Sequence, residues 1–167
     1  YYVWAEKVGA GEQISNLYIA KMENANTLST AQVLLSTPDY KWERHGFWVN
    51  EGPAVVVHED KIYLTYSASD TSPAYCVGLL EANINDNLLD PHNWEKKRTP
   101  LLKSNPERKL YGPGHNSFTK NEKNEDIIVF HARTTDKLLC DNPLYDPNRH
   151  AMLGKVKWTD KGMNIIY

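Results

Sequence analysis

The sequence predicts an all-β protein made of a repeated unit of short strands. Segments rich in β-branched and aromatic residues recur along the 167 residues, and no convincing helical pattern separates them. The segments return at an interval of about 60 residues, each after a polar turn. Four short strands at this interval are typical of β-propeller blades, with an ordinary β-sandwich as the alternative fold.

The recurring strands define the units in chain order. A strand rich in Tyr, Ile and Val is expected at residues 1–5, 62–66 and 127–131. A second strand is expected at residues 17–20, 75–78 and 151–154. A tryptophan-bearing segment follows in each unit, and its recurrence favours a place in the blade core: Trp42, Trp94 and Trp158.

The second and third units each begin with an additional strand, at residues 51–58 and 114–120, that the first unit lacks. A propeller needs at least four blades to close, whereas the repeat fills roughly two and three-quarter blades. We therefore expect the chain to be the C-terminal part of one propeller domain, with units at residues 1–45, 46–105 and 106–167.

Composition excludes several classes of function. The net charge of −2 gives no basic field for nucleic acid and no polybasic membrane patch. No apolar stretch approaches the roughly 20 residues of a membrane-spanning helix. Cys76 and Cys140 lack the paired spacing of a zinc site, and we interpret them as two buried free thiols. The 10 Tyr and 5 Trp suit sugar-like ligands, although they suit strands equally well.

Glu51 is the main candidate for chemistry. It stands just before a Gly-Pro break, at the mouth of the apolar run of residues 54–57, where a side chain can be held rigid. The neighbouring aromatics Phe47 and Trp48 would lower the local dielectric and disfavour a charged carboxylate, as a general acid requires. The alternative is a solvated glutamate in a turn.

Two motifs about 60 residues apart resemble glycoside hydrolase family 43. Asn50-Glu51-Gly52-Pro53, with the strand at residues 62–67, resembles the acid-bearing blade of that family. The segment at residues 111–118, with its Gly-Pro-Gly-His sequence, followed by residues 127–133, is similar to the next blade of that family, and residues 149–162 are similar to its last repeat strand. The exo-acting α-L-arabinofuranosidase branch is favoured because residues 89–94 and 114–117 both match it.

The resemblance implies a five-bladed propeller, so that the three units become the rest of blade 3, blade 4 and blade 5. It also implies inverting hydrolysis of arabinosyl or xylosyl linkages by three carboxylates: an Asp base, an Asp that tunes the acid, and a Glu acid. Glu51 matches the acid. Both Asp positions are expected upstream of Tyr1.

The resemblance suggests further site residues. His115 is expected near the floor of the site, orienting a carboxylate or touching a central ion or water, and calcium on the propeller axis makes it a candidate metal ligand. Arg149 is expected to reach the sugar pocket, and Trp48 and Phe118 to face a sugar ring. The alternatives are a packed structural His115 and an exposed turn Arg149. No cofactor is expected to be required, and His131 and Arg133 are interpreted as mainly structural.

The sequence is compatible with three functions. The chain is expected to be part of an α-L-arabinofuranosidase that acts on arabinose-containing plant cell-wall glycans, secreted or periplasmic, with the cytoplasm as the alternative. A β-xylosidase or an endo-arabinanase is the second hypothesis. The third is a non-catalytic propeller that binds glycans or proteins, because the fold alone does not decide function.

The expected absence of the base gives a first prediction. The isolated 167-residue chain should turn over an aryl arabinofuranoside negligibly, since inverting hydrolysis needs a carboxylate to activate water. A turnover assay on the purified chain tests this. Robust hydrolysis would contradict the expectation that the base lies upstream of Tyr1.

Overall fold

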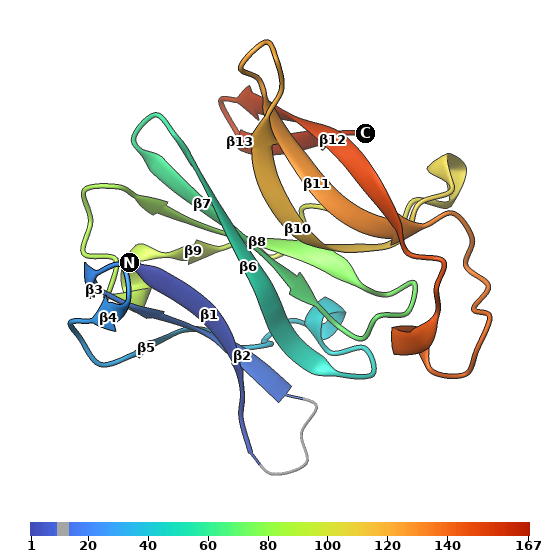
Figure 1. Ribbon diagram of the computed structural model, residues 1–167, viewed down its shortest axis with the longest axis horizontal. Helices are drawn as coiled ribbons and strands as arrows, with labels where there is room; N and C mark the ends of the chain where they lie inside the picture. Colours follow the sequence, from blue (N-terminus) through green and yellow to red (C-terminus); the bar gives the residue numbers. More distant parts are fainter. Residues whose placement is uncertain (10–13) are drawn as a thin grey trace.

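The computed structural model describes residues 1–9 and 14–167, which form almost only β-strands (Figure 1). The first part holds β1 (Tyr2–Lys7), β2 (Ile14–Ala20), β3 (Met22–Asn24), β4 (Thr27–Leu28) and β5 (Val33–Ser36). The middle part holds β6 (Trp48–His58), β7 (Lys61–Ala68), β8 (Cys76–Asn83) and β9 (Glu95–Lys96). The last part holds β10 (Tyr111–Lys120), β11 (Asp126–Arg133), β12 (His150–Thr159) and β13 (Gly162–Ile166).

The helical segments of the described residues are short 3-10 turns. They are η1 (Lys41–Glu43), η2 (Pro91–Asn93), η3 (Pro106–Arg108) and η4 (Pro143–Tyr145). In residues 1–9 and 14–167, no helix has the length and apolar character needed to cross a membrane. The all-β prediction is therefore confirmed, and so are the strands expected in each unit.

The strands pair in antiparallel meanders that follow chain order. β6 to β9 form one meander, and β10 to β13 form a separate four-stranded sheet, drawn in orange and red in Figure 1. β2 pairs in antiparallel fashion with both β1 and β5, and in the described residues it also pairs in parallel with β6, Ile14 with Trp48 and Ser15 with Val49. The additional strands expected at residues 51–58 and 114–120 are confirmed as parts of β6 and β10.

The middle sheet (β6 to β9) is covered on both faces, on one by the first sheet (β1, β2 and β5) and on the other by the last sheet (β10 to β13). Leu64 and Tyr66 of β7 belong to a core shared with β2 and β5, whereas Tyr63 belongs to a second core shared with β11 to β13. Trp42 and Trp94 contribute to the first core and Trp158 to the second, which confirms their structural assignment. Because alternate side chains of β7 face different sheets, this strand connects the two halves of the described chain.

The two cysteines lie in different environments. Cys76, on β8, is buried in the first core, and burial raises the pKa of its thiol to about 12. Cys140 is exposed on the loop between β11 and β12. The interpretation of both as buried thiols is therefore wrong for Cys140, because that segment is a surface connection rather than a strand.

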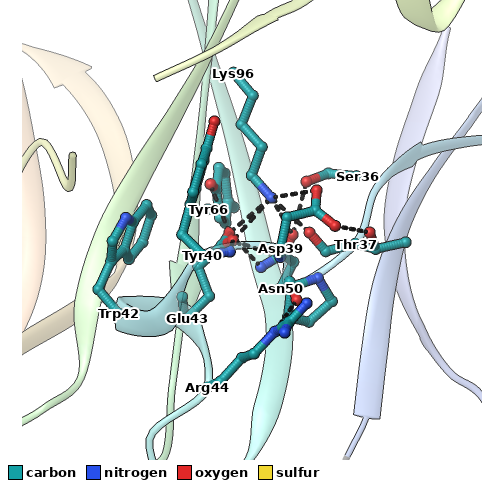
Figure 2. Close-up of polar contacts among 12 residues, drawn as sticks. Ser36, Thr37, Asp39, Tyr40, Trp42, Glu43, Arg44, Asn50, Tyr66 and Lys96 are labelled. Carbon is teal, nitrogen blue, oxygen red and sulfur yellow. Dashed lines mark hydrogen bonds and ion pairs between the residues drawn. The ribbon is translucent and has the colours of Figure 1, made fainter. Parts of the chain in front are cut away.

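A buried polar network joins the first and middle sheets (Figure 2). Glu43, at the end of η1, is fully buried, and its carboxylate oxygens lie 2.8 Å and 3.0 Å from the Lys96 ammonium nitrogen on β9. The same carboxylate accepts hydrogen bonds from the Tyr66 hydroxyl at 2.9 Å and from the Asn50 amide at 3.0 Å. The backbone N–H groups of residues 39 and 40 complete its coordination.

Asn50 carries this network to the strand that bears Glu51. Its side chain is fully buried, and its amide oxygen accepts a hydrogen bond of 2.7 Å from the Ser36 hydroxyl. The Ser15 hydroxyl donates to the Asn50 carbonyl at 3.1 Å. The residue before Glu51 is therefore fixed by β2, β5 and η1 together.

Removing the cation from this network should strongly destabilise the fold. The substitution Lys96→Met leaves the buried Glu43 carboxylate without its counter-charge, and we expect a loss of about 3–5 kcal/mol. Urea denaturation gives the free energy of unfolding.

Two further variants make the test specific. Lys120→Met breaks the exposed ion pair with Asp126 and should cost no more than about 1 kcal/mol. Adding Glu43→Gln to Lys96→Met should recover part of the loss, because it removes the unpaired charge. Equal losses for Lys96→Met and Lys120→Met would contradict the assignment.

Candidate active site

Glu51 lies at an irregularity of β6. It pairs with Ser67 of β7, but the next regular pair is Ala54 with Thr65, so the register shifts between them. Gly52 supplies the turn with a φ of +54°, a value that glycine adopts without strain. The Gly-Pro break therefore forms a β-bulge within a continuous strand, and the bulge sets the direction of the Glu51 side chain.

A second bulge faces the first from the neighbouring sheet. β10 shifts register on both sides of Gly114, and Gly112 and His115 have φ values of +58° and +48°. The His115 backbone N–H donates to the Ser67 hydroxyl at 2.6 Å. A Cβ on Gly52 would lie 3.2 Å from the His115 ring, so the two bulges meet closely.

Tyr75 makes the direct contact with Glu51. Its hydroxyl donates to the Glu51 carboxylate at 2.5 Å, and the tyrosine is almost fully buried between the middle and last sheets. Burial, followed by the nearby Glu51 carboxylate, raises the pKa of Tyr75 well above its ordinary value. The phenol therefore stays protonated and acts as a hydrogen-bond donor.

His131 of β11 supports Tyr75 from the other side. The two rings are stacked, with centroids 5.4 Å apart and an interplanar angle of 8°. Burial lowers the pKa of His131 to about 4, assisted by the positive charges of Arg149 and Arg133. A neutral imidazole therefore lies against the tyrosine near neutral pH.

A pocket of about 740 Å³ opens beside Glu51. Its walls come from the first sheet, the segments around β6, the β7–β8 loop and the β11–β12 loop, and they are Ala5, Lys7, Ile14, Ser15, Phe47, Val49, Glu51, Ser69, Thr71 and Leu144. Glu51 is the one carboxylate in this set of described residues. The pocket thus combines apolar walls, hydroxyl groups and one rigidly held carboxyl group, which suits a small polar ligand such as a sugar.

The other predicted site residues lie at different distances from this pocket. His115 adjoins the Glu51 bulge, and Arg149 donates to the backbone carbonyl of the pocket residue Leu144 at 2.6 Å. Trp48 is outside the described lining and contacts the guanidinium of Arg44. Phe118 packs against the core of the last sheet. None of these four residues is among the described lining residues, but His115 lies against the Glu51 bulge and Arg149 contacts the pocket residue Leu144.

The chain matches proteins of known activity over nearly its whole length. The model for "Glycosyl hydrolases family 43" matches residues 1–164. The chain belongs to glycosyl hydrolase family 43. The resemblance inferred from the motifs around Glu51 and His115 is therefore confirmed.

Three proteins similar to this chain are arabinofuranosidases by name. An extracellular exo-alpha-(1->5)-L-arabinofuranosidase of Streptomyces avermitilis is 43% identical over 97% of this chain, and alpha-L-arabinofuranosidase 43 of Humicola insolens is 44% identical over 97%. The alpha-L-arabinofuranosidase of Lactobacillus brevis superposes with a TM-score of 0.91 at 46% identity, over 99% of this chain and 51% of that one. The chain spans about a third of the length of those two curated relatives, 34% of each.

Several residues around the family 43 site carry no local signal in the sequence. Tyr75 has the sequence pattern of an ordinary strand tyrosine, and only its hydrogen bond to Glu51, made within the middle sheet from a position 24 residues away, connects it with the site. Arg133, expected to be structural, is fully buried and donates to the carbonyls of Thr71 and Pro143 at 2.6 Å and 2.9 Å. It thereby joins two of the loops that form the pocket.

No group of three or more His, Cys, Asp or Glu side chains suited to a metal occurs among residues 1–9 and 14–167. His115 has exposed surface and no such partners in that set. Calcium prefers six to eight oxygen ligands, so a single imidazole does not define a calcium site. The role of His115 as a metal ligand stays a prediction.

The low pKa of His131 predicts a pH dependence of stability. The unfolded state, with a His pKa near 6.5, binds more protons than the native state between about pH 6.5 and pH 4. The free energy of unfolding should therefore fall as the pH drops through this window. His131→Phe keeps an aromatic ring on Tyr75 and should make this fall shallower.

Urea midpoints at steps from about pH 7.5 to pH 4 measure the effect, with the difference between parent and variant at the highest pH as the reference. If the urea midpoints of the parent and of His131→Phe change in parallel over the whole pH range, the pKa of His131 is not lowered in the folded protein.

Proposed function

We propose that the protein is a glycoside hydrolase that acts on arabinofuranosyl linkages, with Glu51 as its general acid. The observation that carries the proposal is the position of Glu51: a rigid bulge in a family 43 chain holds this carboxyl group at the edge of the pocket. The named activity of relatives at 43–44% identity favours arabinofuranosyl over xylosyl substrates.

The proposed reaction proceeds with inversion. Glu51 protonates the glycosidic oxygen of the leaving group while a carboxylate base activates water on the opposite face, and such pairs stand about 6.5–9.5 Å apart. The described lining residues include no second carboxylate. We assign the base to a part of the whole protein outside this chain, consistent with the 34% coverage of the relatives.

The same assignment gives the chain a place in a larger fold. We propose that its three groups of strands are consecutive blades of a five-bladed propeller, with boundaries at residues 1–45, 46–105 and 106–167. The packing of the middle sheet supports this proposal: the strands before it in the sequence cover one of its faces, and the strands after it cover the other. The pocket then lies where the first, middle and last units meet.

Pocket chemistry supports a sugar ligand. Phe47 and Leu144 offer apolar surface to a sugar ring, and the hydroxyl of Thr71 is a hydrogen-bonding group on the same walls. Arg149, one residue before β12, is proposed to reach sugar hydroxyls as substrate enters. Arabinose-containing glycans are the proposed substrates, and secretion is the proposed localisation, as the name of the Streptomyces avermitilis relative indicates.

Replacing the acid should make activity depend on the leaving group. In the complete protein, Glu51→Gln should lower kcat/KM on arabino-oligosaccharides by about 10²–10⁴-fold, because a poor leaving group needs protonation. An aryl arabinofuranoside with a good leaving group should keep most of its rate. Initial rates on a series of aryl leaving groups measure the dependence.

Glu59→Gln provides the matched control. Glu59 is an exposed glutamate at the β6–β7 turn, outside the pocket lining, and its substitution should leave both substrates unaffected. Equal losses of Glu51→Gln on good and poor leaving groups would rule out the acid role. Full activity of Glu51→Gln would indicate that the pocket beside Glu51 is not the catalytic site.

A further inference from the structure

The Tyr75 hydroxyl is held in place by three separate parts of the chain. Tyr75 immediately precedes β8, and its backbone N–H donates to the Ser72 carbonyl at 3.0 Å. Its ring stacks on His131 of β11. Its other neighbour is Gly114 of β10, where a Cβ would lie only 2.1 Å from the Tyr75 ring. The absence of a side chain at Gly114 therefore creates the space that the ring fills.

This arrangement positions one oxygen of Glu51. The Tyr75 hydroxyl is 2.5 Å from Glu51 Oε1, a short bond of the kind formed between a hydroxyl and a carboxylate. The tyrosine is only 1% exposed, so water does not readily replace this partner. The second carboxylate oxygen, Oε2, accepts no hydrogen bond from the described residues.

We propose that Tyr75 is a positioning residue for Glu51: it holds Oε1, so that Oε2 carries the proton that is delivered to the leaving group. This inference rests on the proposed function of Glu51 as the acid. Tyr75 is not itself a proton donor to substrate. It fixes the rotation of the carboxyl group, since an acid that rotates freely delivers its proton in fewer productive orientations.

The charged and titratable groups around Glu51 come from several elements. Lys7 of β1 lines the same pocket, and His115 of β10 lies against the bulge. His131 of β11 and Arg149 lie on the Tyr75 side. These groups are unchanged in a Tyr75→Phe variant. A change in the pH profile of kcat/KM in that variant is therefore assigned to the loss of the tyrosine hydroxyl.

The test is Tyr75→Phe in the complete protein, assayed on arabino-oligosaccharides across pH. The hydroxyl favours the carboxylate form of its partner, so its removal should move the alkaline limb of kcat/KM to higher pH by about one unit. The loss of orientation should lower kcat by about tenfold with little change in KM. Unchanged kcat and an unmoved limb would overturn the inference.

Tyr66→Phe is the matched control. Tyr66 is equally buried and also donates to a glutamate, Glu43 at 2.9 Å, but that glutamate lies outside the pocket lining. Its substitution should lower the urea midpoint without moving the alkaline limb. An equal movement in both variants would assign the effect to general loosening and overturn the inference.

A nearly isosteric change covers the case in which Tyr75→Phe does not fold. Site-specific incorporation of 3-fluorotyrosine at position 75 strengthens the donor, so the alkaline limb should move in the opposite direction, to lower pH. A limb that stays in place would refute the positioning role. The leaving-group series of Glu51→Gln separates the two proposals: if Glu51 behaves as the acid and both Tyr75 changes are silent, only the present inference fails.

Discussion

The ion pair between Glu43 and Lys96 is the interaction on which the arrangement of the first and middle sheets depends. A fully buried carboxylate is costly unless it is paired and hydrogen-bonded, and here β7, β9 and the residues before η1 all supply donors. Asn50 extends the network to β2 and β5 (Figure 2). Because Asn50 precedes Glu51, the network that joins two sheets also fixes the start of the candidate site.

Alternation along β7 determines what lies on each side of that site. Leu64 and Tyr66 face the first sheet, whereas Thr65 and Ser67 accept hydrogen bonds from Asn116 and His115 of β10. The polar side of the strand thus binds the backbone of the second bulge. The packing of β10 against the middle sheet also places Tyr75 next to Glu51, because the Tyr75 ring occupies the space that a side chain at Gly114 would fill.

The sequence predicted the parts of this protein that repeat. Strand positions, the structural tryptophans and the family all follow from side-chain periodicity and from two motifs around Glu51 and His115, which are local patterns. The aromatics were harder to assign. Phe118, predicted to face a sugar ring, packs against the second core, and its contact with sugar stays a prediction. Cys140 was expected to be buried. It is exposed because it lies on the loop between β11 and β12 and not on a strand.

The sequence by itself determined the all-β class, the order of the strands and Glu51 as the candidate acid, because each depends on neighbours within a few positions. Only the tertiary structure decided which side chains hold that residue. Glu43 and Lys96 are 53 positions apart, and Glu51 and Tyr75 are 24 apart. Such pairs form only when the chain is folded, because burial makes each unpaired polar group costly, and no local pattern in the sequence records that cost.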